Sequence, residues 1–176
     1  MKYLIALSLV AIALTGCASN VSQTVNKPIT VQEHSNNIIY IAVSSDSTIS
    51  EDKNYAKTRQ ELIDTIIQKL KIELPSSQVV TSNKPNEGIS AQITIHEFNY
   101  VSGAARFLTG VLSGKAKLGA KLELVDIASN KNIGEVLLGT SSKFSEGIFG
   151  GTTGRQIEAV ATEVVNLLKK SSKQST

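Results

Sequence analysis

The sequence contains one cysteine and two histidines among 176 residues. A single cysteine cannot form a disulfide within the chain, so the folded part must be stabilised by its core alone. We do not expect a metal site, because His34 falls in a polar segment and His96 falls on the polar face of a predicted strand, with no further cysteine or histidine to complete a zinc site. Neither histidine accompanies a Gly-x-Ser-x-Gly turn, so no catalytic residue is assigned.

The chain also lacks a large excess of charge of one sign. The chain has 18 Lys and Arg against 15 Asp and Glu, without long basic runs, which argues against nucleic-acid binding. Lys115, Lys117 and Lys121 alternate along one predicted strand face, which is typical of a solvated surface, with an anionic partner as the alternative. The segment Gly147–Gly154 lacks the lysine of a phosphate-binding loop, so no nucleotide or other cofactor is expected. A weak anion site beside Arg155 stays open, although a capped turn is favoured.

Long apolar runs are confined to the N-terminus. After Lys2, the segment Tyr3–Leu14 is almost wholly apolar but too short to span a bilayer core, which needs about 20 residues. Such a segment is typical of a signal peptide. It ends in Leu14-Thr15-Gly16-Cys17, which resembles the bacterial lipobox. We therefore expect a diacylglyceryl group on the Cys17 thiol, cleavage between Gly16 and Cys17, and palmitate among the acyl chains of the anchor.

The alternative is ordinary secretory cleavage at a nearby small residue such as Ala13 or Ala18. Ala18 and Ser19 follow the cysteine, with no aspartate to retain the protein at the inner membrane, so we expect a lipid-anchored protein on the periplasmic side of the outer membrane. Residues 1–16 are then the signal peptide. Residues 17–37 are polar, carry Pro28 and are expected to form a flexible tether.

Residues 38–170 are expected to form one domain, followed by a polar tail at 171–176. The run Ile38–Ser44 predicts a strand covered on both faces, and the period within Lys53–Leu74 predicts a helix that Pro75 stops. Alternation predicts strands at Ile89–His96 and Lys115–Leu124. Further strands are expected at Gln78–Ser82 and Ile133–Phe144, and a second helix around Ile157–Leu168, with Thr153 and Gln156 as its capping box and a frayed end from Lys169. This order predicts an α+β fold, with a mostly antiparallel sheet of about five strands and two helices on one face.

Two connections between these elements contain glycines and apolar residues where polar turns are usual. They are Gly103–Gly114, between the two alternating strands, and Glu146–Arg155, before the last helix. Glycine lets a loop bend tightly. We expect the two connections to lie at one end of the sheet and to present a partner surface, whose predicted contacts are Arg106, Phe107, Leu108, Val111, Leu112, Ile148 and Phe149. The alternative is that Phe107 and Phe149 belong to the core.

These features together resemble a known group of proteins. The lipobox, the stretch from Gly103 to Ala116, Asp126 and the Gly-Ile-Phe-Gly-Gly segment at Gly147–Gly151 are similar to bacterial envelope lipoproteins classed as a domain of unknown function. The resemblance covers Ile38–Leu168 and implies a periplasmic α/β domain like those of outer-membrane assembly lipoproteins. It implies no catalytic residue.

The expected function is therefore a non-enzymatic envelope lipoprotein that binds a protein partner or assembles with itself. Two alternatives stay open, namely a lipid- or glycan-binding carrier or enzyme of the envelope, and a subunit of an oligomeric assembly associated with a pore.

Overall fold

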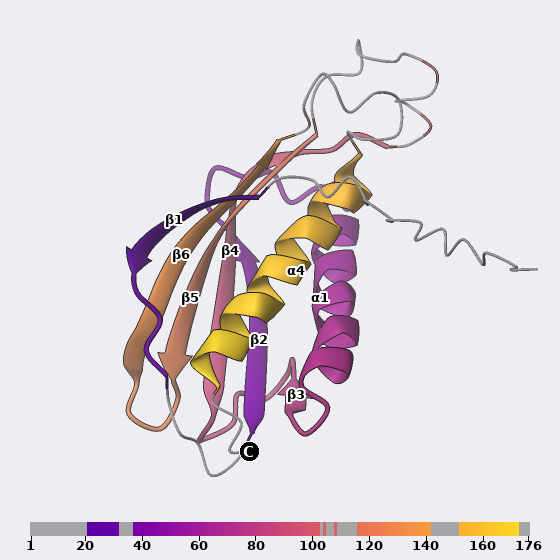
Figure 1. Ribbon diagram of the computed structural model, residues 1–176. Coiled ribbons are helices and arrows are strands. Elements are labelled where there is room, and N and C mark those ends of the chain that lie inside the picture. The colour runs from indigo at the N-terminus through magenta and orange to yellow at the C-terminus, as the bar shows by residue number, and fades with distance from the viewer. Residues whose placement is uncertain are drawn as a thin grey trace, which may run out of the picture.

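Two helices cover one face of a six-stranded sheet (Figure 1). The computed structural model describes residues 21–31, 37–102, 104, 108, 116–141 and 152–172, so the predicted signal peptide and Cys17 lie outside the described part. The described elements are, in chain order, β1 Val21–Lys27, β2 Ile38–Ser45, α1 Lys53–Glu73, β3 Gln78–Val80, β4 Ile89–Asn99, β5 Lys117–Asp126, β6 Lys131–Ser141 and α4 Thr153–Ser171.

The sheet has the strand order β1-β6-β5-β4-β2-β3 and is mixed. The neighbouring pairs β1–β6, β6–β5 and β5–β4 are antiparallel, whereas β2 runs parallel to both β4 and β3. The parallel pairs follow from α1, which carries the chain from β2 back across the sheet before β3 and β4. The predicted α+β class with both helices on one face is confirmed, while the sheet has one strand more and a larger parallel part than expected.

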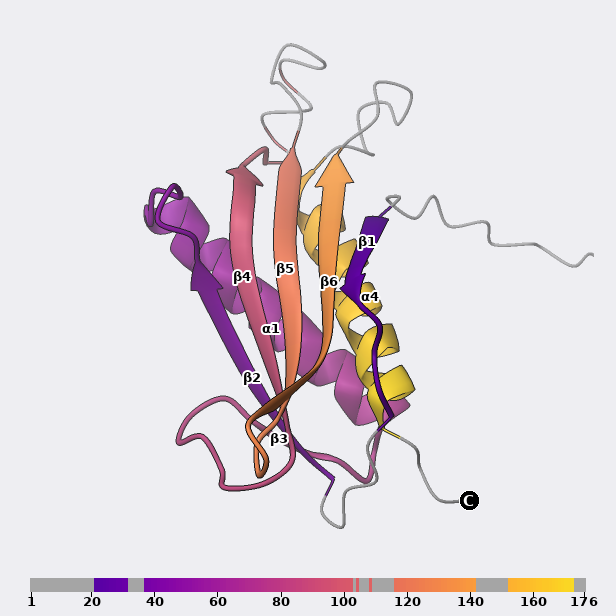
Figure 2. The same ribbon diagram turned by 90° about the vertical axis from the view of Figure 1, so that its left-hand side faces the viewer.

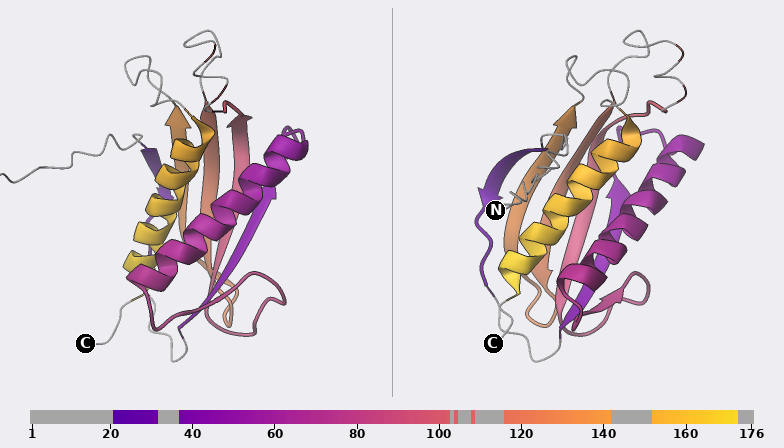
Figure 3. Two further views of the ribbon diagram at one scale, coloured as in Figure 1. Left: turned by 90° about the vertical axis from the view of Figure 1, so that its right-hand side faces the viewer. Right: turned by 45° about the vertical axis from the view of Figure 1, so that its right-hand side comes forward.

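The core lies between the sheet and the helices. Alternate residues of the strands point toward α1 and α4, and Figure 3 shows both helices lying across this face. Fully buried large side chains from both layers meet there: Ile41, Leu62, Ile66, Leu70, Ile93, Ile95, Leu118, Leu122, Leu124, Ile133, Leu138 and Leu168. The helices are also joined at the surface by the ion pairs Lys69–Glu158 and Lys169–Glu73.

Strand β2 differs from its prediction on one face. Ile39, Ile41 and Val43 are buried under the helices, but the alternate residues Ile38, Tyr40 and Ala42 are only half-buried. No described helix covers this outer face (Figure 2). The run is continuously apolar because β2 is an inner strand of the sheet, not because two layers of helices enclose it.

The tether predicted for residues 17–37 is wrong for β1. Val21–Lys27 pairs antiparallel with β6, from Val21 opposite Thr140 to Lys27 opposite Glu135. Six of its seven side chains are exposed, so no apolar period marks the strand. Its stability comes from the backbone ladder and from side-chain bonds, such as the Ser22 hydroxyl donating to the Gly139 carbonyl at 3.0 Å. An edge strand of this kind cannot be recognised by hydrophobic pattern.

The two helices begin differently. The Asp52 carboxylate caps α1 by accepting from the amides of Asn54 and Tyr55, both at 2.9 Å. The predicted capping box of α4 is wrong, because Thr152 is the N-cap and makes no side-chain cap bond. At its other end α4 continues through Lys169 to Ser171, whose side chain is fully buried, so the fraying expected from Lys169 is also wrong.

Candidate functional site

Both glycine-bearing connections attach to the same end of the sheet. Asn99 at the end of β4 lies opposite Lys117 at the start of β5, and Lys117 lies opposite Ser141 at the end of β6. We call this end, with Asn99–Ser102, Leu108, Lys117, Ser141 and Thr152–Arg155, the upper end, as it stands in Figure 2. The turns at Thr81–Gly88 and Ile127–Asn130 form the lower end. The attachment points of the two connections are thus adjacent, as the order of the strands predicted.

Of the predicted contact residues, the described part of the chain includes Leu108. Its side chain is 79% exposed, which fits a surface role better than a place in the core. The others, Arg106, Phe107, Val111, Leu112, Ile148 and Phe149, lie outside the described residues, as do Gly16 and Cys17. Their roles stay predictions.

A buried threonine fastens the start of α4 to the end of β4. The Val101 amide donates to the Thr153 hydroxyl at 2.8 Å, and the Thr153 amide donates to the Val101 carbonyl at 3.0 Å. The hydroxyl can also donate to that carbonyl, at 3.3 Å. Both residues are 3% exposed. Thr153 therefore fixes the points where the two connections leave and rejoin the domain, a role that the capping-box interpretation missed.

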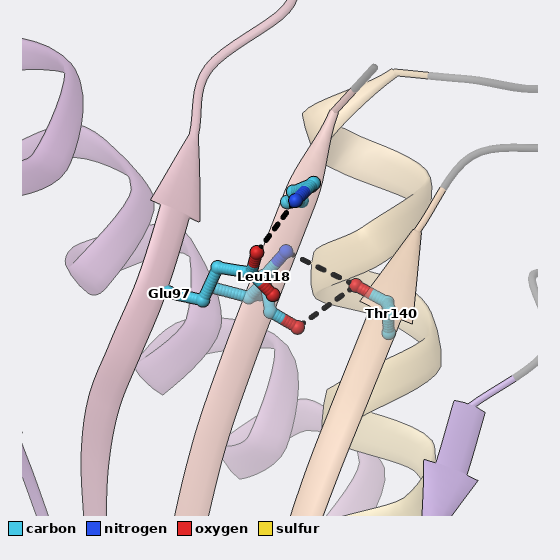
Figure 4. Close-up of polar contacts among 4 residues, drawn as sticks. Glu97, Leu118 and Thr140 are labelled. Atoms are coloured by element: carbon cyan, nitrogen blue, oxygen red, sulfur yellow. Dashed lines mark hydrogen bonds and ion pairs between the residues drawn. The ribbon is translucent and has the colours of Figure 1, made fainter.

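A second threonine joins β5 to β6 at this end. Thr140 donates its hydroxyl proton to the Leu118 carbonyl at 2.9 Å and accepts from the Leu118 amide at 3.2 Å (Figure 4). The Lys117 ammonium, also on β5, binds the Glu97 carboxylate of the neighbouring strand β4 at 2.7 Å. These contacts hold the three strand ends in a fixed arrangement, although the half-exposed ion pair contributes little free energy.

The lysines predicted to share a strand face are mixed with carboxylates. Lys117 pairs with Glu97, and Lys121 lies 3.8 Å from Glu123, while Lys115 is outside the described residues. Such a face is not strongly basic, which favours the solvated surface over an anionic partner.

The outer face also contains a β-bulge, where the register shifts between Ile95 and Glu97. Gly119 lies opposite the bulge, and a Cβ there would come within 2.8 Å of His96 and 2.9 Å of Glu97. The position requires glycine. The bulge leaves the His96 side chain exposed on the surface.

A shallow cavity of about 370 Å³ lies at the upper end between the first turns of α1 and α4. Its lining residues are Lys57, Glu61, Tyr100, Val101, Ser102, Thr152, Thr153 and Gly154. Lys57 and Glu61 form an ion pair across one turn of α1 at 3.7 Å. The walls therefore offer hydroxyl groups and one pair of opposite charges.

Beside the cavity, the helices bury polar side chains. Tyr55 and Thr58 on α1 and Gln156 on α4 are almost fully buried. Their hydroxyl and amide groups have no hydrogen-bond partner among the described residues. Tyr55 is held by an edge-to-face contact with Phe98, with ring centroids 5.9 Å apart. A buried polar group without a hydrogen-bond partner lowers the free energy of unfolding, so these three side chains destabilise this part of the core.

The loop between β2 and α1 contributes one perturbed carboxyl group. The Thr48 amide donates to the Asp46 carboxylate at 2.9 Å, and this bond lowers the pKa of Asp46 below its usual value.

Within the described ranges, no group of three or more His, Cys, Asp or Glu side chains is placed to hold a metal ion. Of the helices described, none is both long and apolar enough to cross a membrane.

Solved structures resemble this fold at low sequence identity. The PelC dodecamer from Paraburkholderia phytofirmans superimposes with a TM-score of 0.51 at 13% identity, covering 88% of this chain and 99% of that chain. A single-residue variant of that dodecamer gives 0.50 at 11% identity, covering 89% and 99%. A PDZ domain protein from Parabacteroides distasonis gives 0.38 at 11% identity, covering 89% of this chain and 38% of that chain. At these identities the likeness to PelC establishes the fold alone.

A comparison with curated proteins gave no match. A family model matches residues 20–144, and this range includes every described strand. It begins one residue before β1, which agrees with the assignment of β1 to the folded domain. The chain belongs to the family described as a domain of unknown function, DUF4410.

Proposed function

We propose that this protein is a bacterial envelope lipoprotein, anchored in the outer membrane through lipid on Cys17, that acts without catalysis as an assembly or accessory component. The observation that carries the proposal is the Leu14-Thr15-Gly16-Cys17 sequence at the end of the apolar N-terminal run. A thiolate is the nucleophile suited to accept a lipid, and the small residue before it suits the cleavage step.

Self-assembly is the partner mode that the comparisons favour. The two PelC structures, which share this fold, are dodecamers. A cyclic assembly is one way in which identical copies can close, and it requires two different surfaces of one chain to meet head to tail. This chain offers two different sheet edges, β1 on one side and β2 with the short β3 on the other.

The two edges differ in how well they are protected. On β1, Val25 is 56% exposed, and the strand has no neighbour on its outer side among the described residues. On the other side, β3 pairs only with Ile38–Tyr40, and the Arg59 side chain donates to the Val43 carbonyl at 2.7 Å, which occupies an otherwise open backbone group. Open edges are sites where a second chain can add, so β1 is the better candidate for a contact between copies.

The two cavities lined by described residues give less support to a lipid carrier. The cavity at the upper end is lined by hydroxyl groups and an ion pair, and a second, of about 520 Å³ between β1 and α4, is lined by Gln23, Glu163, Asn166, Lys169 and Lys170. Ligand pockets are mostly apolar with a few polar groups. The polar walls of both favour an assembly role over a carrier role.

Cys17→Ser tests the anchor. We expect it to abolish metabolic labelling with a clickable palmitate and to leave the precursor uncleaved, because serine cannot form the thioether that processing requires. Continued labelling of the serine variant would contradict the lipoprotein proposal.

Assembly is tested by native mass spectrometry of the detergent-extracted protein. We expect an oligomer that Val25→Asp weakens, because the change places a charge on the open edge of β1. Ile72→Asp is the matched control, since Ile72 is a 77% exposed apolar residue on α1. A monomeric wild-type protein, or an oligomer sensitive only to Ile72→Asp, would overturn assembly through β1.

A further inference from the structure

The start of β1 determines which end of the domain can face the membrane. Val21 lies opposite Thr140, next to the last residue of β6, so β1 begins at the upper end (Figure 2). Cys17 precedes Val21 by four residues, and a chain of four residues spans at most about 14 Å. The distance along β6 from Thr140 to Lys131 is nine residue steps, or about 31 Å. A lipid on Cys17 can therefore reach the upper end but not the lower end.

Contacts along β1 prevent it from acting as a loose spacer. The Asn26 amide donates to Glu135 at 2.8 Å, and the Thr30 amide donates to the Ile133 carbonyl at 2.7 Å. Ile29 packs closely over Gly134, where an added Cβ would lie 2.7 Å from the Ile29 side chain. The segment from Val21 to Thr30 is thus fixed to the sheet. A link of four residues then joins the sheet to the lipid proposed on Cys17.

The connection between β4 and β5 leaves and rejoins the domain at the upper end, and it contains an exposed apolar residue. The Leu108 side chain is 79% exposed. At the lower end, the turn sequences are Thr-Ser-Asn-Lys-Pro-Asn-Glu-Gly and Ile-Ala-Ser-Asn. An exposed apolar side chain such as Leu108 can be buried by an apolar partner. Because the link from Cys17 to Val21 spans at most about 14 Å, the acyl chains are the apolar partner that the chain itself brings to the upper end.

We infer that the upper end docks on the bilayer surface, with Leu108 among the residues at the lipid interface. The inference rests on the proposed lipidation of Cys17 and adds the orientation of the domain and the chemistry of its partner, a lipid surface. Burial of apolar side chains into the interface would add to the binding energy of the acyl chains. The lower end would then face the periplasm.

Depth measurements can test this orientation on the lipidated full-length chain. Because Cys17 is the only cysteine and its thiol is used by the lipid, a cysteine introduced elsewhere is the single site for a maleimide fluorophore. Leu108→Cys places the probe at the upper end, and Ile72→Cys places it on the last turn of α1 at a similarly exposed apolar position. Thr24→Cys places it on β1, to detect a domain lying on its edge.

The labelled proteins are reconstituted in phosphatidylethanolamine–phosphatidylglycerol vesicles containing lipids with a nitroxide on the acyl chain. We expect the Leu108 probe to be quenched several-fold more than the Ile72 probe, with the Thr24 probe in between. Equal quenching at Leu108 and Ile72, or strongest quenching at Thr24, would overturn end-on docking.

Intact mass measured on the same samples separates the two proposals. A lipidated chain without preferential quenching at Leu108 contradicts the docking and leaves the lipoprotein proposal standing. A chain without lipid on Cys17 contradicts both.

Discussion

The two ends of the sheet are built by different chemistry. At the lower end, turns satisfy their own polar groups. Asp126 accepts from the Ser129 amide at 2.7 Å, and Asn83 and Asn130 adopt positive φ values of 52° and 53°, which asparagine tolerates. At the upper end, two threonines fasten strand and helix ends, and the connections carry apolar residues in their sequence. The contrast agrees with the proposal that the lower end faces water and the upper end faces a partner.

The largest effect should come from a glycine at the lower end. Gly88 has φ +103°, and a Cβ there would lie 2.3 Å from the Ile38 carbonyl oxygen, so Gly88→Ala should lower the free energy of unfolding by at least about 2 kcal/mol. Urea denaturation measures this. Gly154→Ala at the upper end is the matched control, because nothing lies within 4 Å of the added Cβ, and it should be neutral or slightly stabilising. Equal losses in both variants would contradict the difference in packing.

Removing the Thr153 hydroxyl should have the next largest effect. Thr153→Val leaves the buried Val101 amide without its side-chain acceptor, and we expect a loss of about 1–3 kcal/mol in thermal or urea denaturation. Thr162→Val serves as the control, since the Thr162 hydroxyl bonds to the Glu158 carbonyl at an exposed position of the same helix. If the two valine variants lose the same stability, Thr153 is not a fastening point.

A gain in stability is expected where a polar group is buried without a partner. Gln156→Leu replaces a fully buried amide by an apolar side chain of similar size, and it should raise the free energy of unfolding by about 1 kcal/mol. Ser90→Ala makes the corresponding change in the lower half of the sheet and should give a smaller gain. Loss of stability on Gln156→Leu would mean that the amide is paired in solution.

The smallest effect concerns the ion pair near the lower end of the helices. The Lys169 ammonium donates a hydrogen bond to Glu73 and lowers the pKa of that carboxyl group. Because the pKa is lowered in the folded state, the contribution of the pair is present above the unfolded pKa and is lost as the pH falls through the folded one. Lys169→Gln should return the pKa toward its usual value in an NMR titration. An unchanged titration would show that the pair does not form in solution.

Hydrophobic patterns predicted most of the helices and strands of the domain. They missed the strand that is held by backbone hydrogen bonds and not by burial of apolar side chains. The helix at Lys53–Glu73 and the alternating strands β4 and β5 were visible because one face of each is buried. Strand β1 was missed because its residues are exposed and its bonds are made by the backbone. The register that places Val21 beside Thr140 could not be derived from a pattern at all, since it depends on a strand more than 100 residues away in sequence.

The candidate site was predicted in outline only. Adjacent attachment of the two connections followed from the order of the strands. The role of Thr153 could not be predicted, because its sequence context fits a capping box equally well. The position of Val101 decides between a helix cap and a bond to the end of β4.

The central claim is that β1 belongs to the sheet, so that the proposed link between Cys17 and the sheet is four residues long, and hydrogen exchange of β1 tests it most directly. In the lipidated full-length protein, we predict that amides within Val21–Lys27 exchange more slowly than in an unstructured peptide of the same sequence, because β1 is paired with β6. Exchange at the rate of the free peptide throughout this segment would show that it is a tether, and the orientation inferred for the domain would no longer follow.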